Sequence, residues 1–199
     1  KNVMRKLLLI IILFIGVNIY GQKNVTLFFR NGDSLKVISH LNSGDTRINY
    51  KVNEGSKKIK VDYKKVKKAI LHYKSSKTTY TFKIKQGYTT PVLLVQIASG
   101  KIFLYKLNFT RNFNSEGMTM SSNHSEYYVC KDDADVVTTF NASGIFIENG
   151  FRKKSKEVFK DCPFLVKKIK NKIWKMKDIP KIVNYYNEEC FPKKQVSSK

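Results

Sequence analysis

Histidine and cysteine are the side chains best suited to catalysis or metal binding at neutral pH, and this chain contains three of each. The histidines, His40, His72 and His124, are far apart in the sequence, and only His124 has a second candidate ligand nearby, Glu126. A zinc site needs three or four ligands, so this pair does not predict one. We interpret His40 and His72 as surface or packing residues of strands.

The other patterns that accompany catalysis are weak. Residues 132–135 read Asp-Asp-Ala-Asp and resemble part of a calcium loop, but they lack the central glycine and terminal glutamate of an EF-hand. We therefore predict a charged turn there. The sequence contains no GxSxG, HExxH, Walker or dinucleotide-binding pattern. We expect no catalytic residue, cofactor or metal; a hydrolase with catalytic residues distant in sequence is the remaining enzymatic alternative.

The strongest chemical signal is positive charge. Among 199 residues, 38 are Lys or Arg and 15 are Asp or Glu, which gives a formal net charge of +23. Between Phe151 and Lys181 there are 12 basic and 3 acidic residues, a net charge of 12 − 3 = +9. Such a surface attracts anionic partners, although an abundance of Lys and Asn also fits a compositional bias. Because 33 of the 38 are Lys rather than Arg, nucleic acid is not the expected partner.

The residues that we expect to contact an anionic lipid or polysaccharide lie on one helix in this segment. Its apolar residues recur at helical spacing, with lysines largely on the opposite face, and such a helix can lie on an anionic bilayer. The alternative is that the apolar face packs on the sheet and that the lysines are only solvated. The candidate contact residues are Lys167, Lys168, Lys170, Lys172, Trp174 and Lys175.

A pair of helices is expected near the C-terminus. Apolar residues from Leu165 to Met176 predict the first helix, and Asp161 and Pro163 are typical of its N-terminus. A second helix is expected after Asp178, and residues 151–160 suit a shorter helix before the pair.

The order of the helices predicts which cysteines pair. Cys162 stands at the start of the first long helix and Cys190 at the end of the second. A short connection around Lys177 makes the two helices antiparallel, so both cysteines lie at the same end of the pair. We predict a Cys162–Cys190 disulfide, and we expect Cys130, in a strand, to be a buried thiol.

The first 21 residues predict export. A basic start precedes an apolar run over residues 7–17 and a small residue, Gly21. A secretory signal peptide has this order, and the run is shorter than the roughly 20 residues of a transmembrane helix. We expect cleavage between Gly21 and Gln22 and a periplasmic or secreted location, where disulfides persist.

The elements that must position these residues are mostly short strands. Between residues 24 and 84, five or six segments alternate apolar and polar residues around turns such as Asn31-Gly32-Asp33. Strands are also expected over residues 91–98, 101–107, 126–131 and 136–140, and residues 108–125 are polar enough to predict an exposed loop. The sequence therefore predicts an α+β fold. An antiparallel β-rich region, a barrel or a curved sheet, covers residues 22–145, and the helices of residues 146–199 pack on it.

Two resemblances accompany this pattern. Val25-Thr26-Leu27 followed by Asn31-Gly32-Asp33-Ser34-Leu35 resembles the opening of small Sm-like or SH3-like barrels. The whole chain is similar to exported Bacteroidetes proteins of unknown function, which implies an envelope location and an α+β fold but no activity. The motifs that carry this similarity are Tyr20-Gly21-Gln22, the Asn31-Gly32-Asp33 hairpin, Gly100-Lys101-Ile102-Phe103-Leu104-Tyr105, Asp161-Cys162-Pro163 and Val183-Asn184-Tyr185-Tyr186-Asn187.

The sequence therefore favours an exported, non-enzymatic binding or structural protein of the bacterial envelope whose β-rich surface contacts a protein partner. The alternative is a polyanion or anionic-membrane binder that acts through the lysine-rich helices over residues 151–181. An uncharacterised hydrolase is the third hypothesis.

Overall fold

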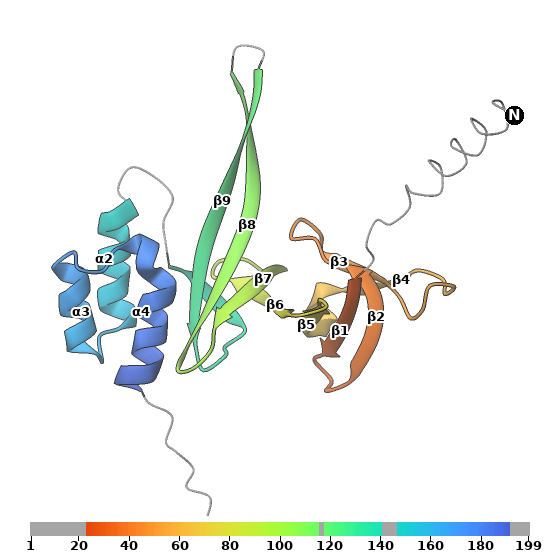
Figure 1. Ribbon diagram of the computed structural model, residues 1–199, viewed down its shortest axis with the longest axis horizontal. Helices are drawn as coiled ribbons and strands as arrows, with labels where there is room; N and C mark the ends of the chain where they lie inside the picture. The colour runs from red at the N-terminus through yellow and green to blue at the C-terminus, as the bar shows by residue number, and fades with distance from the viewer. Residues whose placement is uncertain (1–22, 116–117, 141–146, 192–199) are drawn as a thin grey trace, which may run out of the picture.

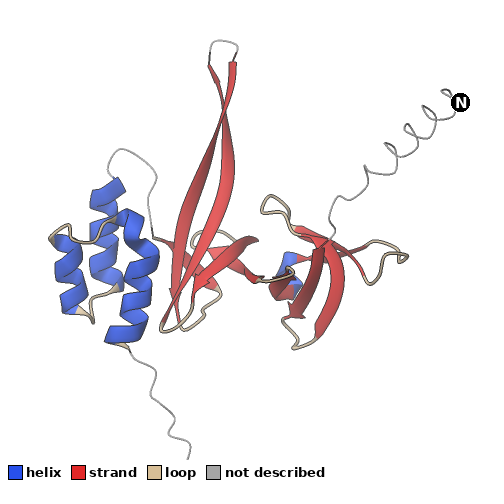
Figure 2. Cartoon of the chain, viewed as in Figure 1, coloured by secondary structure: helices blue, strands red, loops and turns tan. Residues whose placement is uncertain are grey.

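The computed structural model describes residues 23–115, 118–140 and 147–191. The predicted signal peptide, the cleavage position between Gly21 and Gln22, and the predicted boundary after residue 145 lie outside these ranges. The described strands form one ten-stranded, mostly antiparallel sheet, and three helices follow it (Figure 1, Figure 2). The predicted α+β class is confirmed, and the three C-terminal helices correspond to the predicted pair and the shorter helix before it.

The strands are β1 (Lys23–Phe29), β2 (Ser34–His40), β3 (Arg47–Lys51), β4 (Ile59–Asp62), β5 (Val66–His72), β6 (Lys77–Lys85), β7 (Pro91–Ala98), β8 (Ile102–Ser115), β9 (Met118–Lys131) and β10 (Val136–Thr139). The helices are α2 (Ile147–Val158), α3 (Pro163–Lys170) and α4 (Ile179–Tyr185). Short helical turns are η1 (Tyr63–Lys65), η2 (Met176–Asp178) and η3 (Tyr186–Cys190).

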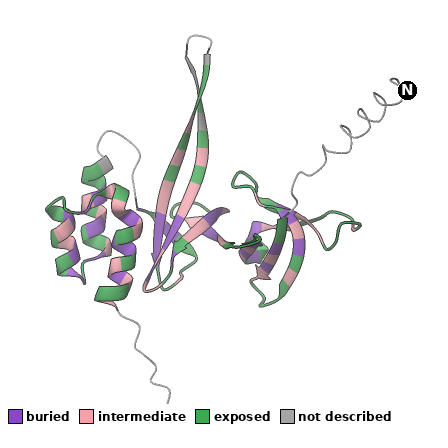
Figure 3. Ribbon diagram, in the orientation of Figure 1, coloured by how far each residue is buried: buried purple, intermediate pink, exposed green. Residues whose placement is uncertain are grey.

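The N-terminal strands surround one apolar core. β1 pairs with β2 on one side and with β5 on the other, and β2, β3 and β4 continue as a meander. Gly32 turns the chain between β1 and β2 with a φ of 98°, which an L side chain rarely adopts. Alternate residues such as Val25 and Leu27 point inward and are almost completely buried. Figure 3 shows buried segments both in these strands and in the C-terminal helices. The resemblance of this unit to Sm-like or SH3-like barrels stays a prediction.

The second half of the sheet closes on itself. β10 pairs antiparallel with β9 and parallel with β6, so β6 to β10 form a five-stranded ring. Alternation along β9 divides its side chains between two clusters. Tyr128 and Cys130 join Tyr105 in the cluster of β7 to β10, whereas Val129 packs with the helices. Cys130 is a free, buried thiol, as predicted.

β8 and β9 form a long hairpin that projects from the rest of the sheet (Figure 1). Their register is continuous from Ile102–Lys131 to Ser115–Met118, so the prediction of an exposed loop over residues 108–125 is wrong. The loop was predicted because these residues are polar and lack apolar alternation, but cross-strand polar pairs hold the two strands together. Thr110 donates to Asn123 over 3.0 Å, and the hydroxyl of Ser125 donates to the side chain of Asn108 over 2.8 Å.

The helices cover the other face of β8 and β9. Ile102, Leu104 and Val129 of the strands pack in one cluster with Phe159 and Ile182 of the helical region. The cluster follows the predicted arrangement of helices on a sheet, because each layer buries an apolar face that it cannot bury alone.

One side chain joins the helical layer to the sheet by hydrogen bonds. The amide of Asn187 accepts from the backbone N–H of Ile102 over 2.9 Å and donates to the backbone carbonyl of Ile102 over 2.8 Å. The Asn187 side chain therefore pairs with the start of β8 as the backbone of a neighbouring strand would. It also lies against Gly100, where an added Cβ would be 2.5 Å from Asn187 Cγ.

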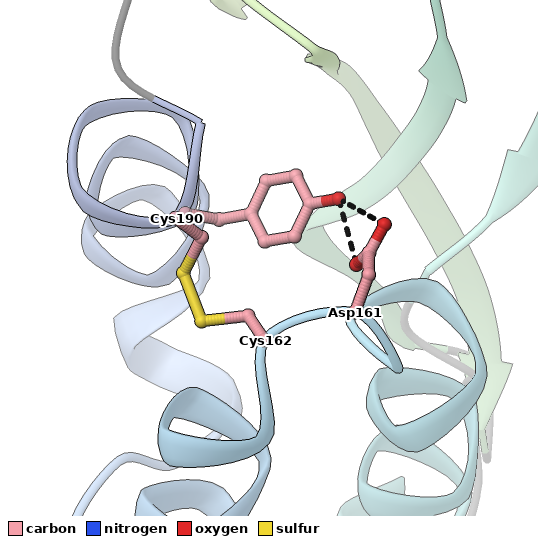
Figure 4. Close-up of a disulfide and its surroundings, with 4 residues drawn as sticks. Asp161, Cys162 and Cys190 are labelled. Carbon is pink, nitrogen blue, oxygen red and sulfur yellow. Dashed lines mark hydrogen bonds between the residues drawn. A yellow bond between two sulfur atoms is a disulfide. The ribbon is translucent and has the colours of Figure 1, made fainter.

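The predicted Cys162–Cys190 disulfide is confirmed, with its Cα atoms 5.9 Å apart (Figure 4). Pro163 is the first residue of α3, as expected, but Cys162 rather than Asp161 is the N-cap, and its side chain makes no capping hydrogen bond. The Asp161 carboxylate instead accepts the hydroxyl of Tyr186 at 2.9 and 3.0 Å. Asp161 therefore stabilises the same end of the helical layer that the disulfide links.

Candidate functional site

Helices α2 and α3 frame a basic cleft. The chain turns between them within Phe159–Cys162, where the backbone N–H of Cys162 donates to the Phe159 carbonyl over 2.9 Å. Phe151 of α2 and Phe159 just after this helix are buried, and so are Leu165 and Ile169 of α3. Because these apolar positions recur at helical spacing, the basic residues between them lie on the remaining faces of each helix.

The cleft has a volume of about 790 Å³ and combines an apolar floor with a cationic rim. Pro163, Val166 and Ile169 contribute apolar surface, and none of the described residues that line the cleft is Asp or Glu. In the described part of the chain, no ion pair involves any of its cations. Its positive charges are therefore not neutralised by neighbouring carboxylates. The basic residues of the lining are Arg152, Lys153, Lys156, Lys160, Lys167 and Lys170.

A buried hydroxyl also lines this cleft. Ser155 is 1% exposed, and its Oγ has no hydrogen-bond partner within the described residues. Burying a hydroxyl without a partner costs about 1–3 kcal/mol, so most such groups in folded proteins are paired. Because the Oγ exposes less than 1 Å² of surface, a ligand in the cleft would accept from it only after the surrounding side chains moved aside.

Two carboxylates near the ends of α2 have other partners. Asp161 accepts from Tyr186 and lies 3.7 Å from Lys131 Nζ. Burial alone would raise the pKa of Asp161, but the Tyr186 hydrogen bond and the charge of Lys131 hold that pKa below its ordinary value. Glu148 Oε1 accepts from the backbone N–H of Met176 over 3.3 Å. Both carboxylates are thus engaged away from the cleft.

The six predicted contact residues are divided between different surroundings. Lys167 and Lys170 are exposed and line the cleft, as a contact role requires. Lys168 instead places its Nζ over three rings of its own chain, at 4.6 Å from Phe164, 4.7 Å from Trp174 and 4.9 Å from Tyr185. These cation–π contacts hold the ammonium group against the protein.

The remaining three predicted residues are not on this helix. The prediction of one helix through Met176 is wrong, because α3 ends at Lys170 and Lys172 has a φ of 62°. Trp174 is only 9% exposed, whereas Ile173, expected on the buried face, is 63% exposed. A smaller second cleft of about 360 Å³ is lined by Lys172, Trp174 and Lys175 together with Glu148, Arg152 and Ile169.

The sequence prediction missed the contribution of α2 and the turn after it to the cleft. Residues 151–160 were expected to form a helix, and their basic residues alternate with the buried positions 151, 155 and 159. That pattern was sufficient to place Arg152, Lys153, Lys156 and Lys160 on the surface. It could not indicate that they face α3, because that depends on how the two helices pack.

A second polar cluster lies where β6 meets the β9–β10 turn. Lys83 is 3% exposed, and its Nζ donates to Asp133 Oδ1 over 2.7 Å and to the carbonyls of Asp133 and Ala134. Tyr105 also donates to Asp133, over 3.0 Å. The charged turn predicted at residues 132–135 is confirmed, and it supplies the counter-charge for a buried lysine.

This cluster does not have the properties of a nucleophilic site. Burial raises the pKa of the Cys130 thiol, so it stays protonated and unreactive. Lys83 uses all three of its donor hydrogens within the protein. Burial would also raise the pKa of Asp133, but the hydrogen bond and charge of Lys83 hold it below its ordinary value. We interpret the cluster as a structural ion pair.

The histidines are dispersed, in keeping with the sequence. His40 and His72 are exposed at the ends of β2 and β5, and the His124 ring stacks on Phe109 with centroids 5.6 Å apart. Within the described residues, no group of three or more His, Cys, Asp and Glu side chains is placed to hold a metal ion. None of the described helices is long and apolar enough to cross a membrane.

Comparison with known proteins finds no matching family model, no similar curated protein and no similar solved structure.

Proposed function

We propose that this chain is an exported, non-enzymatic binding protein that holds an acidic polysaccharide in the α2–α3 cleft. The observation that carries the proposal is a concave surface that, within the described ranges, has six cations, no lining carboxylate and a buried hydroxyl without a partner. Lys and Arg form strong, charge-assisted hydrogen bonds with carboxylate and sulfate groups. The apolar floor at Pro163 and Val166 can pack against the C–H faces of a sugar ring.

A polysaccharide fits these residues better than a flat bilayer does. A helix lying on a membrane needs its aromatic residues and lysines directed outward. Here Trp174 is 9% exposed and the Lys168 ammonium group lies over three rings of its own chain. The cleft instead offers groups of both helices to a ligand that can enter it. The predicted signal peptide and the Cys162–Cys190 disulfide support a location outside the cytoplasm, where such polymers occur.

The proposal is tested with purified protein and labelled polygalacturonate oligomers at near-physiological salt. The variant Lys167→Glu/Lys170→Glu reverses two exposed charges of the cleft. Its matched control, Lys57→Glu/Lys58→Glu, makes the same change of net charge at exposed positions between β3 and β4. We expect the cleft variant to weaken binding about tenfold or more, or about 1.4 kcal/mol, and the control to change it little.

Two other ligands, neutral dextran and anionic vesicles, distinguish binding of an acidic polysaccharide from other kinds of binding. Neutral dextran should not bind, because it offers no anionic acceptor. Equal loss of binding in both double variants would mean that net charge alone attracts the polymer, and the cleft would have no specific role. Binding to phosphatidylglycerol vesicles without binding to polygalacturonate would assign the surface to membranes and overturn the polysaccharide proposal.

A further inference from the structure

The outer edge of β9 lacks a strand neighbour toward the tip of the hairpin. β10 pairs with β9 only at Tyr128 and Val129, so over Met120–His124 the one neighbouring strand in the described sheet is β8. Alternate backbone N–H and C=O groups on this edge therefore point away from the sheet. Such an edge is a ready template for another strand.

This edge also lacks the charges that usually protect exposed strands. No Lys, Arg, Asp or Glu occurs from Met118 to Ser125, in a chain where 38 + 15 = 53 of 199 residues carry charge. Natural edge strands are commonly short, charged or interrupted by proline. The edge strand β4 follows that rule, because it has four residues and two of them are Lys60 and Asp62.

Contacts across the hairpin hold this strand in an extended conformation. His124 stacks on Phe109, and Asn123 accepts a hydrogen bond from Thr110. Cross-strand pairs of this kind stabilise a two-stranded ribbon. A partner strand would therefore meet a preformed edge, and less conformational entropy would be lost on pairing.

We propose that the β9 edge pairs antiparallel with the same edge of a second copy of this chain, which gives a symmetric dimer. A two-fold axis makes such a contact self-complementary, because the same stretch of β9 forms both sides of it. A residue that follows the axis on one strand pairs with a residue that precedes the axis on the other. This inference is independent of the proposed ligand of the cleft.

Electrostatics permits a second copy at this place. With pairing centred on Ser122, the two Tyr128 residues are 2 × (128 − 122) = 12 residues apart, roughly 40 Å at about 3.4 Å per residue. The Debye length is about 8 Å at physiological salt, so repulsion between the two positively charged bodies is screened. A dimer through the lysine-rich helices would instead bring like charges into contact.

Sedimentation equilibrium of the purified protein tests the proposal from low micromolar to near-millimolar concentration. We expect the average mass to rise toward twice that of the monomer, with little change when the salt is raised several-fold. The variant Met120→Lys/Ser121→Lys adds charge to both faces of the edge and should weaken dimerisation about tenfold or more. The control Thr89→Lys/Thr90→Lys adds the same charge at exposed positions between β6 and β7 and should leave dimerisation unchanged.

A second variant shortens the hairpin without touching the rest of the sheet. Replacing residues 109–124 by Asn-Gly keeps the Asn108–Ser125 pair and closes it with a favoured two-residue turn. It should be monomeric and retain the circular dichroism of a folded α+β protein. A monomer at all concentrations, or a dimer that survives in both hairpin variants, would overturn the proposal. So would a dimer that tightens strongly with salt.

Discussion

The Ser155 hydroxyl gives the sharpest test of the proposed cleft. Replacing Ser155 by Ala removes a buried oxygen that has no partner in the described structure, which relieves a cost of about 1–3 kcal/mol. Alanine also favours the helix interior by up to about 0.5 kcal/mol, and a small void offsets part of the gain. We therefore expect the free energy of unfolding of the ligand-free protein to rise by about 1–2 kcal/mol. For a chain of this size, that raises Tm by about 2–8 °C.

The same variant should bind polygalacturonate less tightly, by about tenfold, because the ligand loses one hydrogen bond in a desolvated cleft. Urea unfolding and a binding isotherm measure the two effects, and Asn149→Ala, at an exposed position of the same helix, isolates the contribution of helix propensity. A gain in stability with a loss of affinity is the signature of a hydroxyl reserved for a ligand. A loss of stability of 1 kcal/mol or more would refute the reasoning, because it would mean that Ser155 already has a partner.

Three further predictions concern the scaffold. Thr81 is a second buried hydroxyl that has no partner among the described residues, so Thr81→Val should raise the free energy of unfolding by about 1 kcal/mol in urea titrations, and a decrease would contradict this. The pKa of Asp133 is lower in the folded protein than in the unfolded chain, so its contribution to stability is present above pH of about 4 and is lost as pH falls through the lower, folded pKa. Asp133→Asn leaves the buried Lys83 without its counter-charge and should destabilise the protein by about 3 kcal/mol at pH 7, with a shallower loss of stability on acidification; an unchanged pH profile would argue against the ion pair. The disulfide joins cysteines 28 residues apart, so Cys162→Ser/Cys190→Ser should lower the free energy of unfolding by about 3–4 kcal/mol, and a loss below 1 kcal/mol would show that the helical layer does not need it.

The strands that were predicted best are those rich in apolar residues. β7 was predicted at its observed bounds, Pro91–Ala98, because its apolar residues serve the cores on both sides of the sheet. The hairpin beyond Leu107 was predicted as a loop, because its pairing depends on polar contacts between residues such as Asn108 and Ser125. Such contacts leave no hydrophobic period in the sequence.

The candidate site was predicted in part for a related reason. The disulfide needed only the order of the helices, so the Cys162–Cys190 prediction held although α3 ends earlier than expected. Lys167 and Lys170 were identified from local charge and do line the cleft. Ser155 was not identified, because a buried hydroxyl without a partner arises from tertiary packing and has no local sequence pattern.

The contact between Asn187 and Ile102 has a consequence for how this sequence can change over evolution. The Asn187 amide occupies the space that a side chain at residue 100 would need, and Gly100 leaves that space free. A larger residue at position 100 would displace the amide and leave two backbone groups of β8 unpaired. Substitutions at the two positions should therefore be coupled: a homologue that keeps Asn187 should also keep Gly100, and one that loses Asn187 becomes free to vary at position 100. Two residues that are 87 positions apart in the sequence would then change together among homologues.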